Sequence, residues 1–181
     1  MDNALKCLEI GPSKKRRPGW DTLDAQRGCT IQARWGHAPL PIDENSYDLV
    51  FASHVLEHIP WFQTAAAVAE VHRILRPNGA FEVWVPDFEK IVRAYFEGSI
   101  LNDQWYPLNP EHDPWKSLNG RVFWGARRGE IGKEVHFHRA CFDAPSLERI
   151  LLQAGFREVA RIQRPEGEGH GWIDLGMRAL K

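Results

Sequence analysis

The spacing of apolar residues predicts that strands alternate with helices along the chain. The candidate strands are short apolar runs without a helical period, bounded by turn-forming residues. They are residues 5–10, 20–24, 30–35, 47–53, 80–85, 157–163 and 172–180. The last two flank the turn-like sequence PEGEGHG and are expected to pair as an antiparallel hairpin. The pattern predicts an α/β fold whose sheet is mostly parallel, with an antiparallel C-terminal addition.

Three helices are predicted from apolar residues that recur three and four positions apart. The first runs from Trp61 to a stop at residues 76–79 (RPNG), and the other two follow the cap residues Asp87 and Asp143. Only the eight residues 12–19 separate the first two strands. This is too few for a usual crossover helix, so the first helix is expected to be missing or one turn long.

The composition is that of an ordinary globular protein. The 181 residues, 43% hydrophobic and 26% charged, fit a single domain over residues 1–181. The net charge of −1 gives no general attraction for nucleic acid. No apolar stretch approaches 18 residues and no secretory signal is visible, so we expect no membrane span. Three cysteines without CxxC spacing indicate reduced thiols in a cytoplasmic protein.

The most informative stretch is YDLVFASHVLEHIP, residues 47–60. Its first half predicts a strand that is buried on both faces. Ser53, His54, Glu57 and His58 follow directly at the carboxyl end of this strand. In open α/β sheets ligands bind at that edge, so these side chains are candidates for a functional site.

Several motifs occur in a meaningful order: LEIG (8–11), PGW followed by Asp24, SYDLVFASHVLEHI (46–59), LRPNG (75–79), VPDFEK (85–90) and HRACFD (138–143). Together they resemble class I S-adenosylmethionine-dependent methyltransferases over nearly the whole chain. Within that family they are most similar to a subgroup associated with polysaccharide and glycan assembly. The resemblance implies a Rossmann-like sheet and S-adenosyl-L-methionine as cofactor.

The resemblance also implies a set of cofactor-binding residues: Glu9, Gly11, Pro12, Asp24, Trp35, Ser53 and His54. A glycine after the first strand lets the backbone approach the methionine part, and a carboxylate ending strand two can accept both ribose hydroxyls. Glu9 corresponds to the acid that helps hold the methionine ammonium. The glycine loop is reduced to Gly11-Pro12-Ser13, and the acid that often contacts adenine is absent. Trp35 is either a stacking face for adenine or a core residue.

Three histidines are candidate catalytic residues: His54, His58 and His138. Methyl transfer from a sulfonium needs an aligned acceptor, and a sugar hydroxyl must lose its proton. A histidine titrates near neutral pH and therefore suits the role of base. Each of the three is also open to a purely structural role.

Residues 99–139 have no sustained period and are rich in aromatic residues, which is typical of a lid or binding insertion. Trp105, Trp115 and Trp124 offer flat faces that suit a sugar ring. We therefore expect this insertion to bind the acceptor, most simply a saccharide or similar small molecule that is O-methylated.

Three other functions compete with this interpretation. HVLEH matches the H-x-x-E-H zinc motif of some peptidases, but that motif needs one continuous helix, so we expect no metal. A nicotinamide enzyme would require G-x-G-x-x-G, which is missing. A non-catalytic methyltransferase-like binding subunit stays open because the glycine loop is reduced. The sequence does not indicate the oligomeric state.

Overall fold

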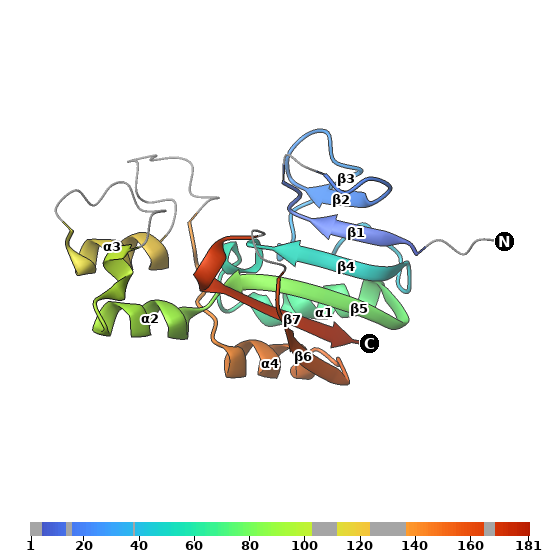
Figure 1. Cartoon of the computed structure of the whole chain (residues 1–181). Coiled ribbons are helices and arrows are strands. Elements are labelled where there is room, and N and C mark those ends of the chain that lie inside the picture. Colours follow the sequence, from blue (N-terminus) through green and yellow to red (C-terminus); the bar gives the residue numbers. More distant parts are fainter. Residues whose placement is uncertain (1–4, 14–15, 38, 103–111, 124–136, 165–168) are drawn as a thin grey trace.

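The fold is built on a seven-stranded sheet with strand order β3-β2-β1-β4-β5-β7-β6 (Figure 1). The computed structural model describes residues 5–13, 16–37, 39–102, 112–123, 137–164 and 169–181. The strands are β1 Cys7–Ile10, β2 Asp21–Asp24, β3 Ile31–Gln32, β4 Tyr47–Ser53, β5 Leu75–Pro86, β6 Glu158–Ile162 and β7 Asp174–Leu180. β1 to β5 are parallel, and β7 pairs antiparallel with β5 and β6. The predicted α/β architecture with its C-terminal hairpin is confirmed.

Two helices, α1 (Thr64–Ile74) and α4 (Ala144–Gln153), pack on one face of the sheet. Val68 and Val71 of α1 and Leu147 of α4 are fully buried there against Phe81 and Val83 of β5. Alternate strand residues point to this face because side chains alternate along a strand. The main core therefore lies on one side of the sheet.

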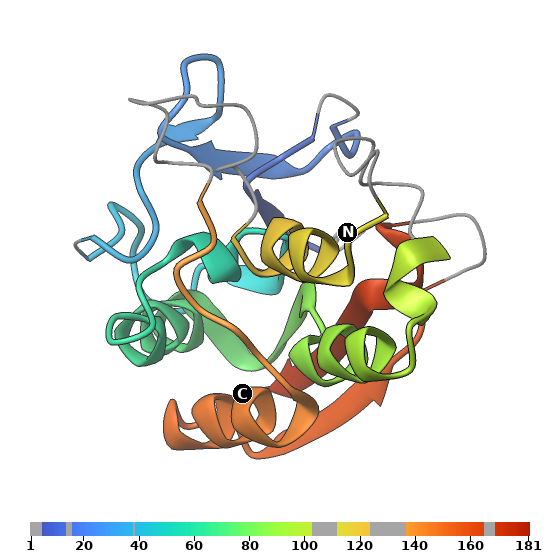
Figure 2. The same cartoon turned by 90° about the vertical axis from the view of Figure 1, so that its left-hand side faces the viewer.

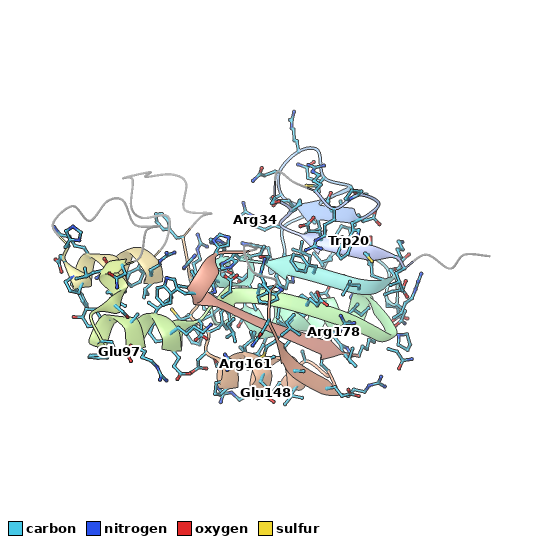
Figure 3. All side chains as sticks on the ribbon, in the orientation of Figure 1. Trp20, Arg34, Glu97, Glu148, Arg161 and Arg178 are labelled. Atoms are coloured by element: carbon cyan, nitrogen blue, oxygen red, sulfur yellow. The ribbon has the colours of Figure 1, made fainter. Side chains whose placement is uncertain are left out.

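The opposite face is covered by arginine and aromatic side chains rather than by a crossover helix. Among the described residues, no helix occurs between β1 and β4, as the short first connection predicts. The Arg17 guanidinium lies 4.2 Å from the ring centre of Phe51, and that of Arg164 lies 4.2 Å from the Trp84 ring. Arg178 of β7, which is labelled in Figure 3, lies opposite Glu82 of β5 and forms an ion pair with it. Cation–π contacts of this kind keep aromatic surface from water while the charges stay near solvent.

The insertion between β5 and α4 forms a second small core. α2 (Phe88–Phe96), the 3₁₀ turn η2 (Ser99–Asn102) and α3 (Pro114–Val122) pack together beyond the carboxyl ends of the parallel strands (Figures 1 and 2). Ile91, Ala94 and Ile100 are buried with Ile173. The helix after Asp87 was predicted and is α2, whereas the lack of a sustained period over residues 99–139 predicted no helix there, so α3 is a correction. Its turns begin at an aspartate cap, Asp113.

Several boundaries differ from the sequence-based prediction, most of them by one or two residues. The strand expected over residues 30–35 shrinks to β3, and β5 begins at Leu75 rather than after the RPNG turn. Asn78 in that turn has φ of 66°, a left-handed conformation that asparagine tolerates, so the strand continues through it. α1 begins at Thr64, three residues after Trp61. Within the described residues, no helix combines the length and apolar composition that a membrane crossing needs.

Helix α4 begins with a capping box, and the stability of the protein is expected to depend on it. The Asp143 side chain accepts a hydrogen bond from Ser146 N, and Ser146 Oγ accepts from Asp143 N. Asp143→Ala leaves the Ser146 amide without its acceptor and should lower the free energy of unfolding by about 1 kcal/mol. Chemical denaturation measures the change, with the exposed Asp43→Ala as control. Equal stability of both variants would contradict the cap's contribution.

Candidate functional site

Two neighbouring cavities open where the parallel strands end. The larger, about 590 Å³, is lined by the ends of β1 and β2 and the residues after them, by residues 33–35 and His37, by His54, Val55, His58 and Ile59, and by Arg139. The smaller, about 210 Å³, is lined by Ser53, His54, Glu57, His58, Pro86, Arg121, His138, His170 and Ile173. His54 and His58 line both. The carboxyl edge of the sheet is therefore the candidate site.

Gly11 and Pro12 form one wall of the larger cavity. Gly11 has φ of 67°, and its N–H donates to Leu23 O at 2.9 Å. A Cβ at this position would overlap the Val55 side chain. The glycine is thus required by the turn and by its packing on the loop after β4, in addition to any approach of a ligand.

Asp24 ends β2 and lies in the larger cavity. Its Oδ1 accepts the N–H of Gln26 at 2.9 Å, which fixes the orientation of the carboxylate. A carboxylate has about four acceptor sites, so most of its capacity stays available. The Asp24 carboxylate can therefore accept hydrogen bonds from hydroxyl groups of a ligand in this cavity.

The other predicted cofactor residues are placed differently. Trp35 lines the larger cavity, but it is buried, and its Nε1–H donates to Ala67 O at 2.8 Å. Its ring also meets Phe81 edge to face, so it is a core tryptophan that forms part of the wall rather than a free stacking face. Ser53 lies in the smaller cavity, where its Oγ accepts from Arg164. Glu9 is buried beside Arg17 and lines neither cavity.

His54 begins the loop after β4 and is held between two carboxylates. Its backbone is left-handed, with φ of 55°. Its Nε2 donates to Asp174 Oδ1 at 2.8 Å, and its Nδ1 lies 3.3 Å from Glu57 Oε1. Burial alone would lower the pKa of His54, but the two carboxylates outweigh burial and raise it to about 9. His54 is therefore an imidazolium at neutral pH, which disfavours the base role predicted for it.

His170 stacks on this imidazolium. The two ring centres are 3.8 Å apart, and the His170 backbone N–H donates to Asp174 Oδ2 at 3.0 Å. Burial and the neighbouring His54 charge lower the pKa of His170 to about 4. A charged and a neutral histidine thus lie side by side in the smaller cavity.

His58 and His138 come together at the junction of the cavities. Their ring centres are 5.1 Å apart, and His138 Nε2 lies 3.9 Å from Glu57 Oε1. Burial lowers the pKa of His138 to about 4, so it is neutral. The carboxyl of Glu57 is fully buried, which would raise its pKa, but His54 and the other histidines hold the pKa below the usual value. All three predicted histidines therefore belong to one cluster.

The sequence HVLEH is a loop with one short 3₁₀ turn, η1 (Leu56–His58), rather than a continuous helix. His54 forms its ion pair with Asp174 in β7. The two histidines therefore do not lie side by side on one face of a helix. The helical H-x-x-E-H geometry is absent from this loop, as the strand before it predicts.

Sequence reasoning missed several residues of the site. Asp174 and His170 lie in and before the last strand, and Arg121 is in α3. Arg34, His37 and Arg139 line the larger cavity. The H-G-W sequence was a usable signal for His170, because it places a histidine in the turn just before the last predicted strand.

Part of the insertion reaches the site, but Trp115, the one of its three predicted stacking tryptophans within the described residues, does not. Arg121 of α3 lines the smaller cavity, and so does His138. Trp115 is 60% exposed, meets Tyr95 edge to face and lines neither cavity. Trp105 and Trp124 lie outside the described residues. The stacking role predicted for these side chains therefore has no support from Trp115.

The amino-acid sequence is similar to those of known methyltransferases. Residues 7–83 match the sequence model of a family described as a methyltransferase domain. An uncharacterised methyltransferase of Mycobacteroides abscessus is 27% identical over 100 residues, which are 52% of this chain and 38% of that protein. A methyltransferase-like protein of Schizosaccharomyces pombe is 27% identical over 95 residues, 45% of this chain and 36% of that protein. The matched part is thus well under half the length of these relatives.

Solved structures show the same fold at low sequence identity. A Thermotoga maritima SAM-dependent methyltransferase, described as a possible histamine N-methyltransferase, has a TM-score of 0.56 and 17% identity, with 98% of this chain and 82% of that chain covered. The Burkholderia thailandensis 1,6-didemethyltoxoflavin N1-methyltransferase, solved with S-adenosylhomocysteine, has a TM-score of 0.57 and 18% identity, with 98% and 71% covered. The chain therefore has the Rossmann-like fold of these S-adenosylmethionine-dependent methyltransferases, and its residues 7–83 match the methyltransferase-domain model.

Proposed function

We propose that this protein is an S-adenosylmethionine-dependent methyltransferase that O-methylates a small polar acceptor such as a saccharide. The observation that carries the proposal is the pair of adjoining cavities. One has a carboxylate at the end of β2, the other is lined by histidines, and His54 and His58 line both. A donor in the first and an acceptor in the second would meet at these side chains.

The larger cavity suits the methyl donor. Asp24 offers carboxylate oxygens for the ribose hydroxyls, and the Gly11 turn forms the wall beside it. Ala33 and Ile59 supply apolar lining for the base, with Trp35 behind them. A volume of about 590 Å³ lies within the range of cavities that hold ligands of this size.

The smaller cavity suits a hydroxyl acceptor. When bound, the cofactor would supply an activated methyl carbon on a sulfonium, to which the acceptor oxygen would bond as the carbon–sulfur bond broke and the sulfur kept its electron pair. The hydroxyl proton must leave to a lone pair near the reacting oxygen. His58 and His138 provide nitrogen atoms there, whereas both nitrogens of His54 face carboxylates.

His54 has a positioning role in this proposal. As an imidazolium it ties Glu57, in the loop after β4, to Asp174 in β7. Two carboxylates and one cation share the buried site, and this arrangement stabilises the charges through opposite partners. His54 thus holds the two sides of the smaller cavity at a fixed separation.

The proposed function is tested by measuring how much the affinity for S-adenosylmethionine depends on the Asp24 carboxylate. Asp24→Ala removes the acceptor for the ribose hydroxyls, a loss of about 1.5–3 kcal/mol for hydrogen bonds to a charged group, so affinity should fall about tenfold or more. Isothermal titration with S-adenosylmethionine and S-adenosylhomocysteine measures it. The exposed Asp43→Ala makes the same charge change away from the cavity and should bind normally.

Two results would count against the proposal. Unchanged affinity in Asp24→Ala would mean that the donor does not use the end of β2. Tight cofactor binding without methyl transfer to any of a panel of sugars and small alcohols would favour the binding-subunit alternative.

A further inference from the structure

We propose that Glu57, His58 and His138 form a binding site for a divalent transition-metal ion at the wall of the smaller cavity. The set revises the expectation that the chain holds no metal, and it differs from the H-x-x-E-H motif because His138 replaces His54. Its role in acceptor binding rests on the proposed function, but the site itself does not.

The donor atoms are already gathered. One ligand atom from each of the three residues lies within 4.8 Å of the others, and His138 Nε2 is 3.9 Å from Glu57 Oε1. Ligands about 2.1 Å from a zinc ion are separated by roughly 3–3.5 Å, so each must move by about 1 Å or less. Side-chain rotation in a cavity provides that movement.

Glu57 supplies a second, independent observation. Its side chain is 1% exposed, and among the described residues no donor meets hydrogen-bond geometry with either carboxylate oxygen. The His54 cation at 3.3 Å offsets charge from one side. A buried carboxylate whose nearest donor is this single contact is costly, and a bound cation would satisfy the oxygens that face the cavity.

Both histidines are oriented as ligands. His58 Nδ1 lies 3.2 Å from the Phe137 carbonyl, and since a carbonyl only accepts, Nδ1 carries the hydrogen and Nε2 keeps its lone pair. A ring nitrogen of His138 likewise donates to the backbone carbonyl of Arg121. Metal-binding histidines commonly donate their other ring N–H in this way, which fixes the tautomer and the ring.

The ligand set defines the class of ion. Two imidazoles and one carboxylate suit Zn²⁺ or Fe²⁺ and leave coordination positions open, whereas Mg²⁺ and Ca²⁺ prefer oxygen ligands. The open positions face the smaller cavity, which all three residues line. An acceptor hydroxyl bound there would have its pKa lowered by the ion, so the ion rather than a histidine would promote its deprotonation.

Metal binding is tested with Co²⁺, whose visible absorption reports nitrogen and oxygen coordination, followed by competition with Zn²⁺. The full chain, freed of any affinity tag and stripped with a chelator, should bind one Co²⁺. His58→Ala and His138→Ala should each weaken binding by at least about 100-fold, more than the loss of an outer-shell partner costs. His170→Ala removes a histidine of the same cavity that is outside the set and should bind Co²⁺ normally.

The outcomes separate this inference from its alternatives. Binding that is lost in His54→Ala and kept in His138→Ala would overturn it in favour of H-x-x-E-H coordination. No stoichiometric Co²⁺, or equal binding by all variants, would also overturn it. Circular dichroism confirms folding, with His138→Gln as a second variant if His138→Ala unfolds. S-adenosylmethionine titration of the same samples shows whether the proposed function fails or holds independently of the metal.

Discussion

His138→Ala is expected to lower the rate of methyl transfer by about 10²–10⁴-fold, the usual effect of losing a group that handles the acceptor's proton. His138 lines the smaller cavity and not the larger one, so the affinity for S-adenosylmethionine should stay within about twofold. The loss is expected whether the histidine accepts the proton itself or holds an ion that acidifies the hydroxyl. Steady-state rates on a sugar panel and calorimetric titration of the cofactor measure the two effects separately.

A matched control lies in the same insertion. His112 is exposed, has φ of 50° and lines neither cavity, and asparagine tolerates this backbone conformation. His112→Asn should therefore transfer methyl groups at the parent rate. If His138→Ala also kept the full rate, the histidine cluster would have no part in activation, and alignment of the acceptor beside the methyl group would be the better explanation.

Phe81→Ala is expected to lower the free energy of unfolding by about 3–5 kcal/mol. Phe81 is fully buried at the centre of β5, meets Trp35 edge to face and stacks on Phe156, with ring centres 6.2 and 6.1 Å apart. Alanine would leave a cavity between the sheet and its helices. Because the main core lies on one side of the sheet, the loss falls on the packing that supports most of the fold.

Urea unfolding measures this change. Phe96→Ala provides the control, since Phe96 is 80% exposed at the end of α2, and its removal should change stability by no more than about 0.5 kcal/mol. A loss below about 1 kcal/mol in Phe81→Ala would show that the site collapses around the missing ring.

Sequence reasoning succeeded where the determining interactions are local. β4 was predicted with its observed boundaries, 47–53, because an uninterrupted apolar run is bounded by turn residues. The caps Asp87 and Asp143 also matched, since a cap bonds to an amide three residues away. The loop nature of HVLEH followed from the strand before it.

The parts that were missed depend on contacts between distant residues. His54 meets Asp174 across 120 positions, and this contact acts together with the nearby Glu57 to raise the pKa of His54. Trp35 bonds to Ala67, 32 residues away, so only the packed structure shows it to be core. No local pattern distinguishes a histidine that is held by carboxylates from one that is free to accept a proton.

The loop from Ser53 to Val55 separates the two cavities by a single stretch of backbone. Ser53 faces the smaller cavity, Val55 packs on Gly11 in the larger one, and His54 between them lines both. Under the proposed function, a methyl donor that shifts this loop would alter the wall of the acceptor cavity, and a resulting change in acceptor affinity would be a coupling between the two sites. Thermodynamic reciprocity then requires the acceptor to alter cofactor affinity by the same factor as the cofactor alters acceptor affinity. The coupling would act through these residues, and reciprocity makes its size independent of which substrate binds first.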